Sequence, residues 1–369
     1  MRQPHPVRAL IAGGGVAGAA VACLLGPEAL LIERERTAHD KICGEFISHE
    51  AQSYLARLGV DPLALGAAEI GGVRLVHGDR VAQAALPFRG LGLSRRTLDA
   101  ALLAHAGAAG ATLLHGHTVR NASPAGLDVE GHGRLSAPAV FLATGKHDLR
   151  GVRRQPQRTP ENLIGLKTYF ALCPTQQAEL SGHVEVLLFR DGYAGLQLIE
   201  GGVANLCLLI SRTRFSAAGG SWHGLRHDLE RSCPHLARRL AGATETLDRP
   251  LSIFRVPYGY VHAPGPADWP GLFRLGDQMG VVPSFCGDGV SIALHSAFSA
   301  VAAHRNGGAG AYHERMRRDV AGQIGRAGWL YRAGRAQPGL AVAAARAWPG
   351  ALRWIARLTR VPPWAMADI

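Results

Sequence analysis

Several features that would place a chain in a specialised class are scarce or missing from these 369 residues. Charged residues make up only 18% of the chain and lysine is rare, while 47% of the residues are apolar, enough for a sizeable core. The six cysteines include no Cys-x-x-Cys pair, so a zinc site is not expected. Cysteines spread in this way predict reduced thiols and a cytoplasmic protein that holds no metal.

Long hydrophobic runs are missing too. The apolar stretch near the N-terminus runs directly into glycines, which predicts a short strand instead of a signal peptide or a membrane span. The formal net charge of +12 could suit a nucleic acid, but the arginines are scattered and no readout motif accompanies them. We therefore expect no nucleic-acid partner, and we assign the positive charge to an anionic cofactor or substrate.

A glycine-rich turn near the N-terminus carries the strongest functional signal. Gly13, Gly15 and Gly18 form a Gly-x-Gly-x-x-Gly pattern between a predicted strand at 7–12 and a predicted helix at 17–25. In this motif the first glycine permits a tight turn, the second lets the backbone approach a pyrophosphate, and the third lets the helix pack on the strand. The pattern predicts a dinucleotide site but does not distinguish NAD from FAD.

The residues around this turn extend the predicted site. Glu33 ends the next predicted strand, where a carboxylate can accept hydrogen bonds from ribose hydroxyls. The cofactor contacts expected here are completed by Val16, Ala17 and Arg34.

A second glycine-rich segment lies far along the chain and favours FAD. Gly276 and Asp277 end a predicted strand, and Gly287 and Gly289 precede a predicted helix that begins at Val290. An aspartate at a strand end can hold a ribityl hydroxyl, and the start of the helix offers N–H groups to a flavin or a phosphate.

Between these two segments the pattern changes from helices to strands. Strands are predicted at 163–172, 183–189, 195–199 and 203–210, with hairpin turns at 191–192 and 201–202. We therefore predict an α/β fold: a Rossmann-like FAD-binding domain of the glutathione-reductase type from 1–160 and 250–305, an inserted antiparallel substrate-binding sheet at 161–249, and a C-terminal helical segment at 306–369.

Three segments resemble FAD-dependent oxidoreductases of the geranylgeranyl reductase and aromatic hydroxylase superfamily. They are the first glycine motif with Glu33, the stretch LSRRTLD at 93–99, and the stretch GDQMGVVPSFCGDG at 276–289. The resemblance implies that Arg95 helps to hold FAD, that the backbone around Val119 lies near the adenine, and that Asp277 lies at the ribityl chain. It also implies flavin-mediated redox chemistry, with NADPH or NADH as the electron donor.

Two features are closer to the geranylgeranyl reductase branch. Gly280 stands where the hydroxylases usually have a histidine, and the stretch KICGE at 41–45 resembles a Cys-Gly loop that passes near the flavin. This resemblance makes Cys43 a candidate active-site residue and Gly44 a cofactor contact; a small buried thiol is the alternative. Glu45 could serve as an acid or base if it is buried.

Three functions stay open at this point. The first is a monooxygenase that hydroxylates an apolar or aromatic small molecule, with a role in secondary metabolism. The second is a reductase or dehydrogenase acting on a C–C or C=C bond, and the third is a non-catalytic flavin-binding module. The hydroxylases' Asp-Gly motif is replaced here by Ala143-Thr144-Gly145, so Gly145 is expected at the cofactor while the handling of nicotinamide is open. A CxWxWxIP-like signature is missing, which disfavours halogenation.

Two further stretches bear on partners. The inserted strands predict an apolar pocket over the flavin, from the alternating Val184, Val186 and Leu188 and from a further set: Leu196, Leu198, Leu206, Leu208 and Ile210. The stretch WPGALRWIARLTRVPPW at 348–364 is aromatic and basic; it predicts either a helix packed on the protein or a peripheral contact with a membrane surface.

Overall fold

The computed structural model describes residues 7–154 and 162–367, and its first layer is a parallel sheet. This sheet has the strand order β17 (Leu272–Arg274), β10 (Ala139–Leu142), β1 (Ala9–Ala12), β2 (Ala29–Glu33) and β6 (Thr112–His115). β1 and β10 are buried along their whole length, as expected for strands covered on both faces. Strands far apart in sequence thus become neighbours: β17 joins a sheet that starts at residue 9.

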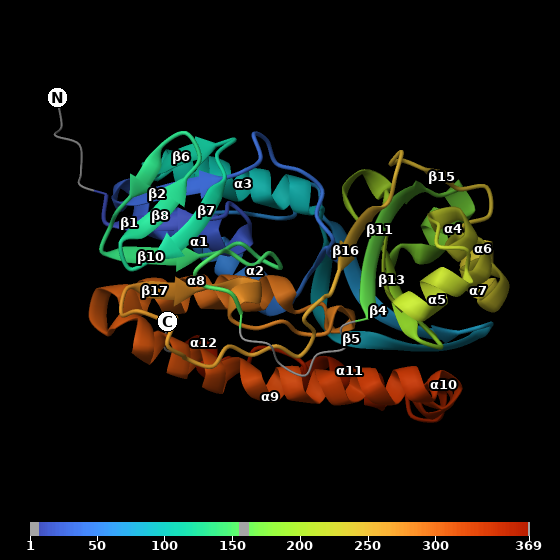
Figure 1. The fold of residues 1–369 in the computed structure, drawn as a ribbon. Helices are drawn as coiled ribbons and strands as arrows, with labels where there is room; N and C mark the ends of the chain where they lie inside the picture. The colour runs from blue at the N-terminus through green and yellow to red at the C-terminus, as the bar shows by residue number, and fades with distance from the viewer. Residues whose placement is uncertain (1–6, 155–161, 368–369) are drawn as a thin grey trace.

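Helices cover one face of this sheet and a small sheet covers the other (Figure 1). α1 (Val16–Leu25), α3 (Arg95–Ala108) and α8 (Gly289–Asn306) share one apolar core with β1 and β2, and α2 (His49–Arg57) packs on α8. On the other face lies an antiparallel sheet of β7 (Val119–Ser123), β8 (Gly126–Val129) and β9 (Gly133–Leu135).

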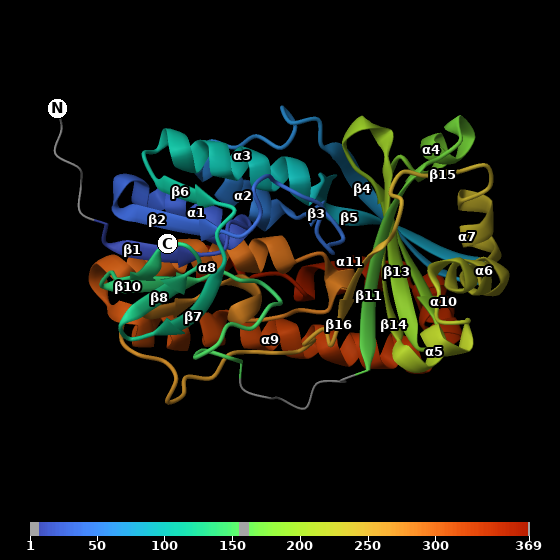
Figure 2. The same cartoon turned by 45° about the horizontal axis from the view of Figure 1, so that its top comes forward.

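A second, curled sheet stands beside the first (Figure 2). Its strand order is β15 (Thr244–Glu245), β11 (Leu163–Ala171), β14 (Ala204–Ser211), β13 (Gly192–Leu198), β12 (Gly182–Phe189), β4 (Ala68–His77), β5 (Arg80–Gly92) and β3 (Phe46–Ile47), and β16 (Leu251–Phe254) pairs with β11. All these pairings are antiparallel except that of β12 with β4.

Two groups of helices cover this second sheet. Its outer face packs on α4 (Pro174–Leu180), α6 (Trp222–Ser232) and α7 (Pro234–Arg239), with α5 (Arg212–Ala217) beside them. The C-terminal helices are α9 (Gly308–Ala336), α10 (Pro338–Ala347), α11 (Gly350–Leu358) and α12 (Pro363–Ala367). α9 contacts β17 in the first sheet and β12 in the second, so it connects the two halves of the molecule.

Most of the predicted elements are confirmed. The expected helix at 17–25 corresponds to α1, and the four middle strands correspond to β11 to β14. Asp191, Gly201 and Gly202 have positive φ angles in the two predicted turns. The long hairpin of β4 and β5 has no counterpart in the prediction, so the second sheet includes residues assigned above to the first domain. The predicted boundary between 160 and 161 lies outside the described residues.

Candidate active site

The first glycine turn has the geometry that its pattern predicts. Gly13 has a φ of 108°, and a side chain there would lie 2.5 Å from the Ala143 carbonyl oxygen. A Cβ at Gly18 would lie 1.9 Å from the carbonyl oxygen of Gly13, so only glycine lets α1 approach the end of β1 this closely. Gly15 differs from both, because its backbone is ordinary and its nearest neighbours are two cationic side chains.

Those cations belong to Arg95 and Lys41. A Cβ at Gly15 would lie 3.3 Å from Arg95 Nη2 and 3.8 Å from Lys41 Nζ. The buried carboxylate of Asp99 holds both groups, through 2.9 Å bonds from Arg95 and a 2.7 Å bond from Lys41. Burial alone would raise the pKa of Asp99, but the two cations outweigh it and lower that pKa, so the carboxylate stays ionised. The start of α1 therefore faces a fixed pair of positive charges.

The acidic residue of the motif buttresses the same turn. Glu33 is buried, and its carboxylate accepts hydrogen bonds from the backbone N–H groups of Gly14, at 2.6 Å, and Glu35, at 3.0 Å. Arg34 is half exposed and pairs with Glu35. Glu33 ends β2 at the carboxyl edge of the parallel sheet, and Val119 begins β7 shortly after His115, the β6 residue that pairs with Glu33.

The second glycine segment meets the first at a small cavity at this sheet edge. Gly276 has a φ of 53°, and its Cβ position is 3.6 Å from the Cβ of Ala17 in α1. The cavity has a volume of about 140 Å³. The predicted cofactor residues that line it are Gly15, Val16, Ala17, Cys43, Gly44, Arg95, Gly145, Gly276, Asp277, Gly287, Gly289 and Val290. Gly13 and Gly18 shape the turn beneath it, whereas Glu33, Arg34 and Val119 do not line it.

The 41–45 loop passes along this cavity and is held by side chains of the curled sheet. Lys167 Nζ donates to the carbonyl of Lys41 at 3.0 Å, and Asn205 Nδ2 donates to that of Gly44 at 2.8 Å. Gln197 Nε2 donates to the carbonyl of Glu45 at 3.0 Å. Three neighbouring strands thus fix the backbone of the loop next to the glycine turns.

The side chain of Glu45 is the most constrained group in this loop. The backbone of Glu45 has a φ of 59°, which is unusual for a residue other than glycine. Its Oε1 accepts from the Arg95 backbone N–H at 2.8 Å and from the Tyr169 hydroxyl at 2.9 Å, and lies 2.5 Å from the ammonium of Lys167. Burial raises the pKa of Glu45, and the attraction of Lys167 opposes that rise. Its other oxygen, Oε2, is buried without a partner among the described residues.

Cys43, the other candidate catalytic residue, is partly buried and is a free thiol. Its Sγ accepts a 3.3 Å hydrogen bond from the backbone N–H of Glu45. Cys43 and Glu45 both line the small cavity, so the loop brings the two candidate catalytic residues to one site.

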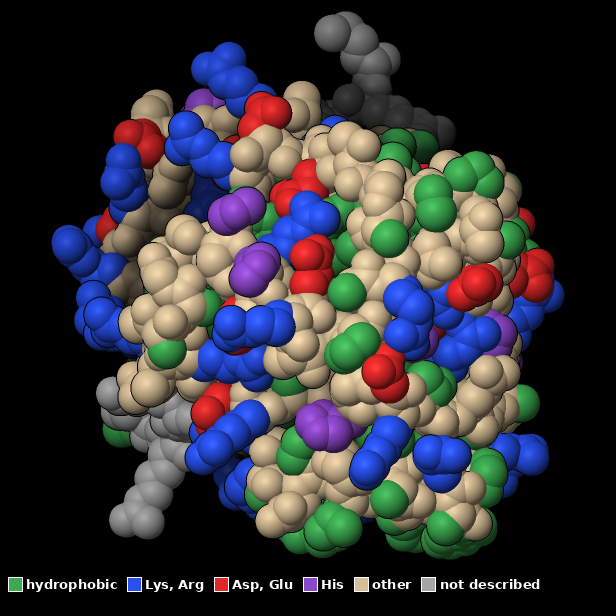
Figure 3. All heavy atoms as spheres, turned by 90° about the vertical axis from the view of Figure 1, so that its right-hand side faces the viewer, with side chains coloured by type: hydrophobic (Ala, Val, Ile, Leu, Met, Phe, Trp, Pro, Cys, Tyr) green, Lys and Arg blue, Asp and Glu red, His purple; other side chains and the backbone are tan. Residues whose placement is uncertain are grey.

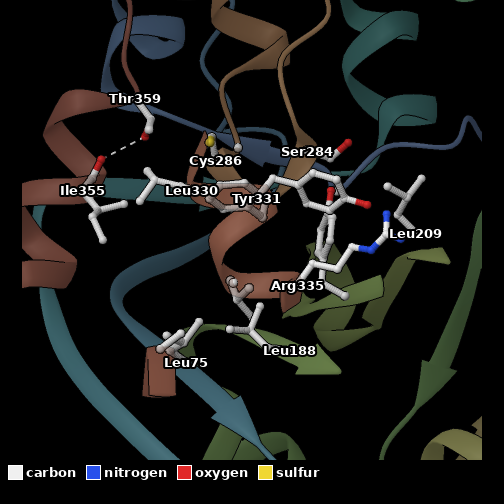
Figure 4. A pocket seen from close by; sticks show the side chains of 18 of the residues that line it. Leu75, Leu188, Leu209, Ser284, Cys286, Leu330, Tyr331, Arg335, Ile355 and Thr359 are labelled. Atoms are coloured by element: carbon white, nitrogen blue, oxygen red, sulfur yellow. Dashed lines mark hydrogen bonds between the residues drawn. The ribbon is translucent and has the colours of Figure 1, made fainter. Parts of the chain in front are cut away.

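A larger cavity of about 670 Å³ continues from the small one, and Lys146, Tyr258 and Ser284 line both. Leu75 and Leu188 enter it from the curled sheet, and Leu330 and Ile355 enter it from α9 and α11 (Figure 4). Its volume falls within the range of small-molecule sites.

Three hydroxyl groups of the larger cavity form a short chain. The hydroxyls of Tyr193 and Tyr258 lie 2.9 Å apart, and the Tyr258 hydroxyl is hydrogen-bonded to that of Ser284. Burial raises the pKa of Tyr258 to about 12, so this phenol stays protonated and can donate to a ligand.

The strand faces that form the cavity were predicted only in part. Val184, Val186 and Leu188 line it as expected. The other predicted set does not form its wall: Leu196, Leu198, Leu206 and Ile210 belong to the core beneath the outer helices, and Leu208, although it borders the cavity, also packs into that core. Alternation puts Gly195, Gln197 and Cys207 on the cavity side instead, and the small residues among them leave the space open.

All three lysines of the chain lie at the junction of the glycine turns, the 41–45 loop and the curled sheet. The chain has 40 lysine and arginine residues in total, so the other 37 are arginines. Lys41 faces the first glycine turn, Lys167 is buried against Glu45, and Lys146 donates to Asp277 at 2.9 Å. Burial alone would lower the pKa of Lys146, but the attraction of Asp277 outweighs it and raises that pKa. None of the three was among the predicted site residues; the scarcity of lysine was the signal that could have identified them.

Comparison with known proteins relates this architecture to flavin-dependent enzymes. No protein-family model matches the chain, and a comparison with curated proteins found no match. Among solved structures, the flavin-dependent brominase Bmp2 superposes with a TM-score of 0.78 at 17% identity, over 96% of this chain and 93% of that one.

Two further structures agree. The flavin-dependent halogenase CmlS gives a TM-score of 0.68 at 20% identity, over 87% of this chain and 64% of that one. PqsL, a probable FAD-dependent monooxygenase from Pseudomonas aeruginosa, gives 0.66 at 18% identity, over 85% and 91%. The chain therefore has the fold of flavin-dependent halogenases and monooxygenases, which confirms at the level of fold the resemblance to FAD-dependent oxidoreductases.

Proposed function

We propose that this protein is an FAD-dependent monooxygenase that hydroxylates an apolar or aromatic small molecule. The observation that carries the proposal is the continuity of the two cavities. One is bordered by both glycine segments and by the cations of Arg95 and Lys146, and the other is large and mostly apolar. The fold shared with a probable monooxygenase supports the same function.

The described residues fit FAD. We infer a binding mode of the glutathione-reductase type, in which the backbone at Gly15 and the cations of Lys41 and Arg95 receive the pyrophosphate. Glu33, Arg34 and Val119 would serve the adenosine end. Asp277 would serve the ribityl chain, and the segment 287–290 would serve the flavin ring.

The chain's own residues would position the reaction. FAD, once bound and reduced, supplies the activation of dioxygen. The apolar walls exclude water and hold the substrate, and the Tyr193–Tyr258–Ser284 chain offers it hydrogen bonds. Lys167 holds the 41–45 loop in place, so Cys43 and Glu45 stay at the cavity, and Glu45 Oε2 has free capacity to accept a proton.

The decisive experiment follows the electrons and the oxygen separately. The flavin-containing protein is reduced anaerobically with NADPH or NADH, then mixed with isotopically labelled dioxygen and candidate apolar or aromatic compounds. A product that carries labelled oxygen supports the proposal. A saturated or desaturated product formed without dioxygen would instead establish the reductase or dehydrogenase alternative, which Gly280 and the 41–45 loop favour.

A cavity-filling variant makes this experiment specific. The Cβ of a residue at Gly195 would have only the Cys207 carbonyl oxygen nearby, at 3.9 Å, so Gly195→Phe can project into the larger cavity. We expect it to retain FAD and reduction by the nicotinamide while losing product. Gly71→Phe, at an exposed position of β4 with open space around it, is the matched control. Flavin that binds but neither accepts electrons nor gives product would favour a non-catalytic flavin-binding module.

Asp277 gives a graded test of the cofactor assignment. If its carboxylate bonds a ribityl hydroxyl, Asp277→Ala should weaken FAD binding by about 1–3 kcal/mol. Flavin fluorescence titration measures this affinity. Lys146→Met removes only the partner of Asp277 and separates loss of the ion pair from loss of the carboxylate. Unchanged FAD affinity in Asp277→Ala would contradict the assignment.

A further inference from the structure

The C-terminal helices expose an unusual set of large apolar side chains. Four of the chain's six tryptophans lie in this part, at Trp329, Trp348, Trp354 and Trp364, and each is between 58% and 64% exposed. Leu340 in α10 is similarly exposed. Tryptophan is amphipathic and is enriched where proteins meet the interface between lipid and water.

The charge of the same segment has one sign. Residues 320–366 contain seven arginines and neither aspartate nor glutamate. Arg335 pairs with Asp191, and Arg360 pairs with Asp288. The exposed arginines Arg332, Arg346, Arg353 and Arg357 form no ion pair with any residue in 7–154 or 162–367. Their positive charge is therefore free to meet an external anion.

The helices that carry these side chains also form one side of the larger cavity. α9, α10 and α11 contribute wall residues to it, and Trp329 and Leu340 both line it and are exposed. Green apolar side chains gather along the lower edge of the molecule, where α10 lies, with blue basic side chains beside them (Figure 3). The apolar cavity thus reaches the surface between exposed apolar groups that are flanked by cations.

We propose that this surface docks on an anionic phospholipid bilayer. The docking surface is defined by Trp329, Leu340, Trp348 and Trp354 with Arg332, Arg346, Arg353 and Arg357. The apolar groups would enter the interface while the arginines meet lipid phosphates, as in other peripheral proteins. Within the described residues no helix is long and apolar enough to cross a membrane, so the contact would be peripheral. The cavity would then open toward the lipid, where an apolar ligand accumulates.

Vesicle sedimentation tests the docking without reference to catalysis. The full-length, flavin-containing protein is mixed with vesicles of phosphatidylcholine alone or of phosphatidylcholine with phosphatidylglycerol, at low and high salt. We expect binding to the anionic vesicles only, released by salt, with a blue shift of tryptophan fluorescence. Arg346→Gln/Arg353→Gln/Arg357→Gln should bind these vesicles roughly 100-fold more weakly, and Trp329→Ser/Trp354→Ser should lose the fluorescence shift.

Matched variants make the result specific to this surface. Arg120→Gln/Arg231→Gln/Arg238→Gln removes the same charge from exposed positions elsewhere, and Leu63→Ser/Phe254→Ser removes exposed apolar groups elsewhere; both should bind as the parent does. Absence of binding to anionic vesicles at low salt would overturn the proposal. So would equal binding to neutral vesicles, or a dimer in solution that Trp329→Ser/Trp354→Ser converts to a monomer. Flavin content, measured in parallel, keeps a failure here separate from a failure of the proposed FAD function.

Discussion

A Gly15→Val protein is expected to fold normally and to be purified without flavin. The two atoms nearest to a Cβ at this position are the mobile ends of Arg95 and Lys41, at 3.3 and 3.8 Å, so the fold can accept the new side chain. The added atoms would occupy the space through which a pyrophosphate must approach the backbone. Absorbance in the flavin region, measured against protein concentration, reports the loss directly.

Two other glycines serve as controls for this result. Gly18→Val should fail to fold, because its Cβ would lie 1.9 Å from a backbone oxygen, and this separates loss of packing from loss of cofactor. Gly71→Val, in open space on β4, should retain both fold and flavin. A folded Gly15→Val protein with full flavin content would show that the cofactor lies elsewhere.

The second large effect is expected at the buried pair of Lys167 and Glu45, neither of which is exposed to solvent. Removing one member of such a pair leaves an uncompensated charge, so Lys167→Met should lower the free energy of unfolding by about 3–5 kcal/mol. Glu45→Gln/Lys167→Met removes both charges and should recover most of the loss. The parent protein, the two single variants Glu45→Gln and Lys167→Met, and the double variant form a double-mutant cycle. Urea unfolding of these four proteins gives the coupling energy between the two side chains.

The pH dependence supplies an independent check. Burial raises the pKa of Glu45 above that of the unfolded chain, so folding favours the protonated acid and this residue's contribution to stability falls as pH rises through the raised pKa. Without Lys167 the pKa rises further. Lys167→Met should therefore be most destabilised near neutral pH and should regain stability as the solution is acidified.

Lys146→Met is the matched control for this cycle. The ion pair of Lys146 with Asp277 is partly exposed, so its loss should change stability by only about 0–1 kcal/mol. A Lys167→Met protein that is no less stable than Lys146→Met would contradict the importance of the buried pair.

The glycine turns could be predicted because their signal is local. The residues from Gly13 to Gly18 carry the turn, the cofactor approach and the helix packing within one short segment, and the resemblance located the second segment. The cavity wall was harder, because alternation along a strand identifies two faces without saying which one meets the cofactor domain. The leucines at 196 and 198 face the helices, and the cavity face carries Gly195 and Gln197.

The ion pair of Glu45 with Lys167 could not be predicted at all. The two residues are far apart in sequence, and a lysine in a strand with mostly apolar neighbours gives no sign of its partner. Only the pairing of β11 within the curled sheet brings Lys167 to the 41–45 loop. The hairpin of β4 and β5 was missed for a related reason, since its glycines and proline break the expected pattern of a strand.

The placement of the three lysines has a practical consequence for chemical labelling. Arginine and histidine supply every other basic side chain, so an ε-amine-selective reagent has no lysine target outside the junction. Lys167 is fully buried, while Lys41 and Lys146 keep about a quarter of their side-chain surface exposed. Acylation of side-chain amines in the native protein is thereby confined to Lys41 and Lys146. A ligand that fills the space beside the glycine turns should shield these two amines, so the acylation rate reports whether that space is occupied.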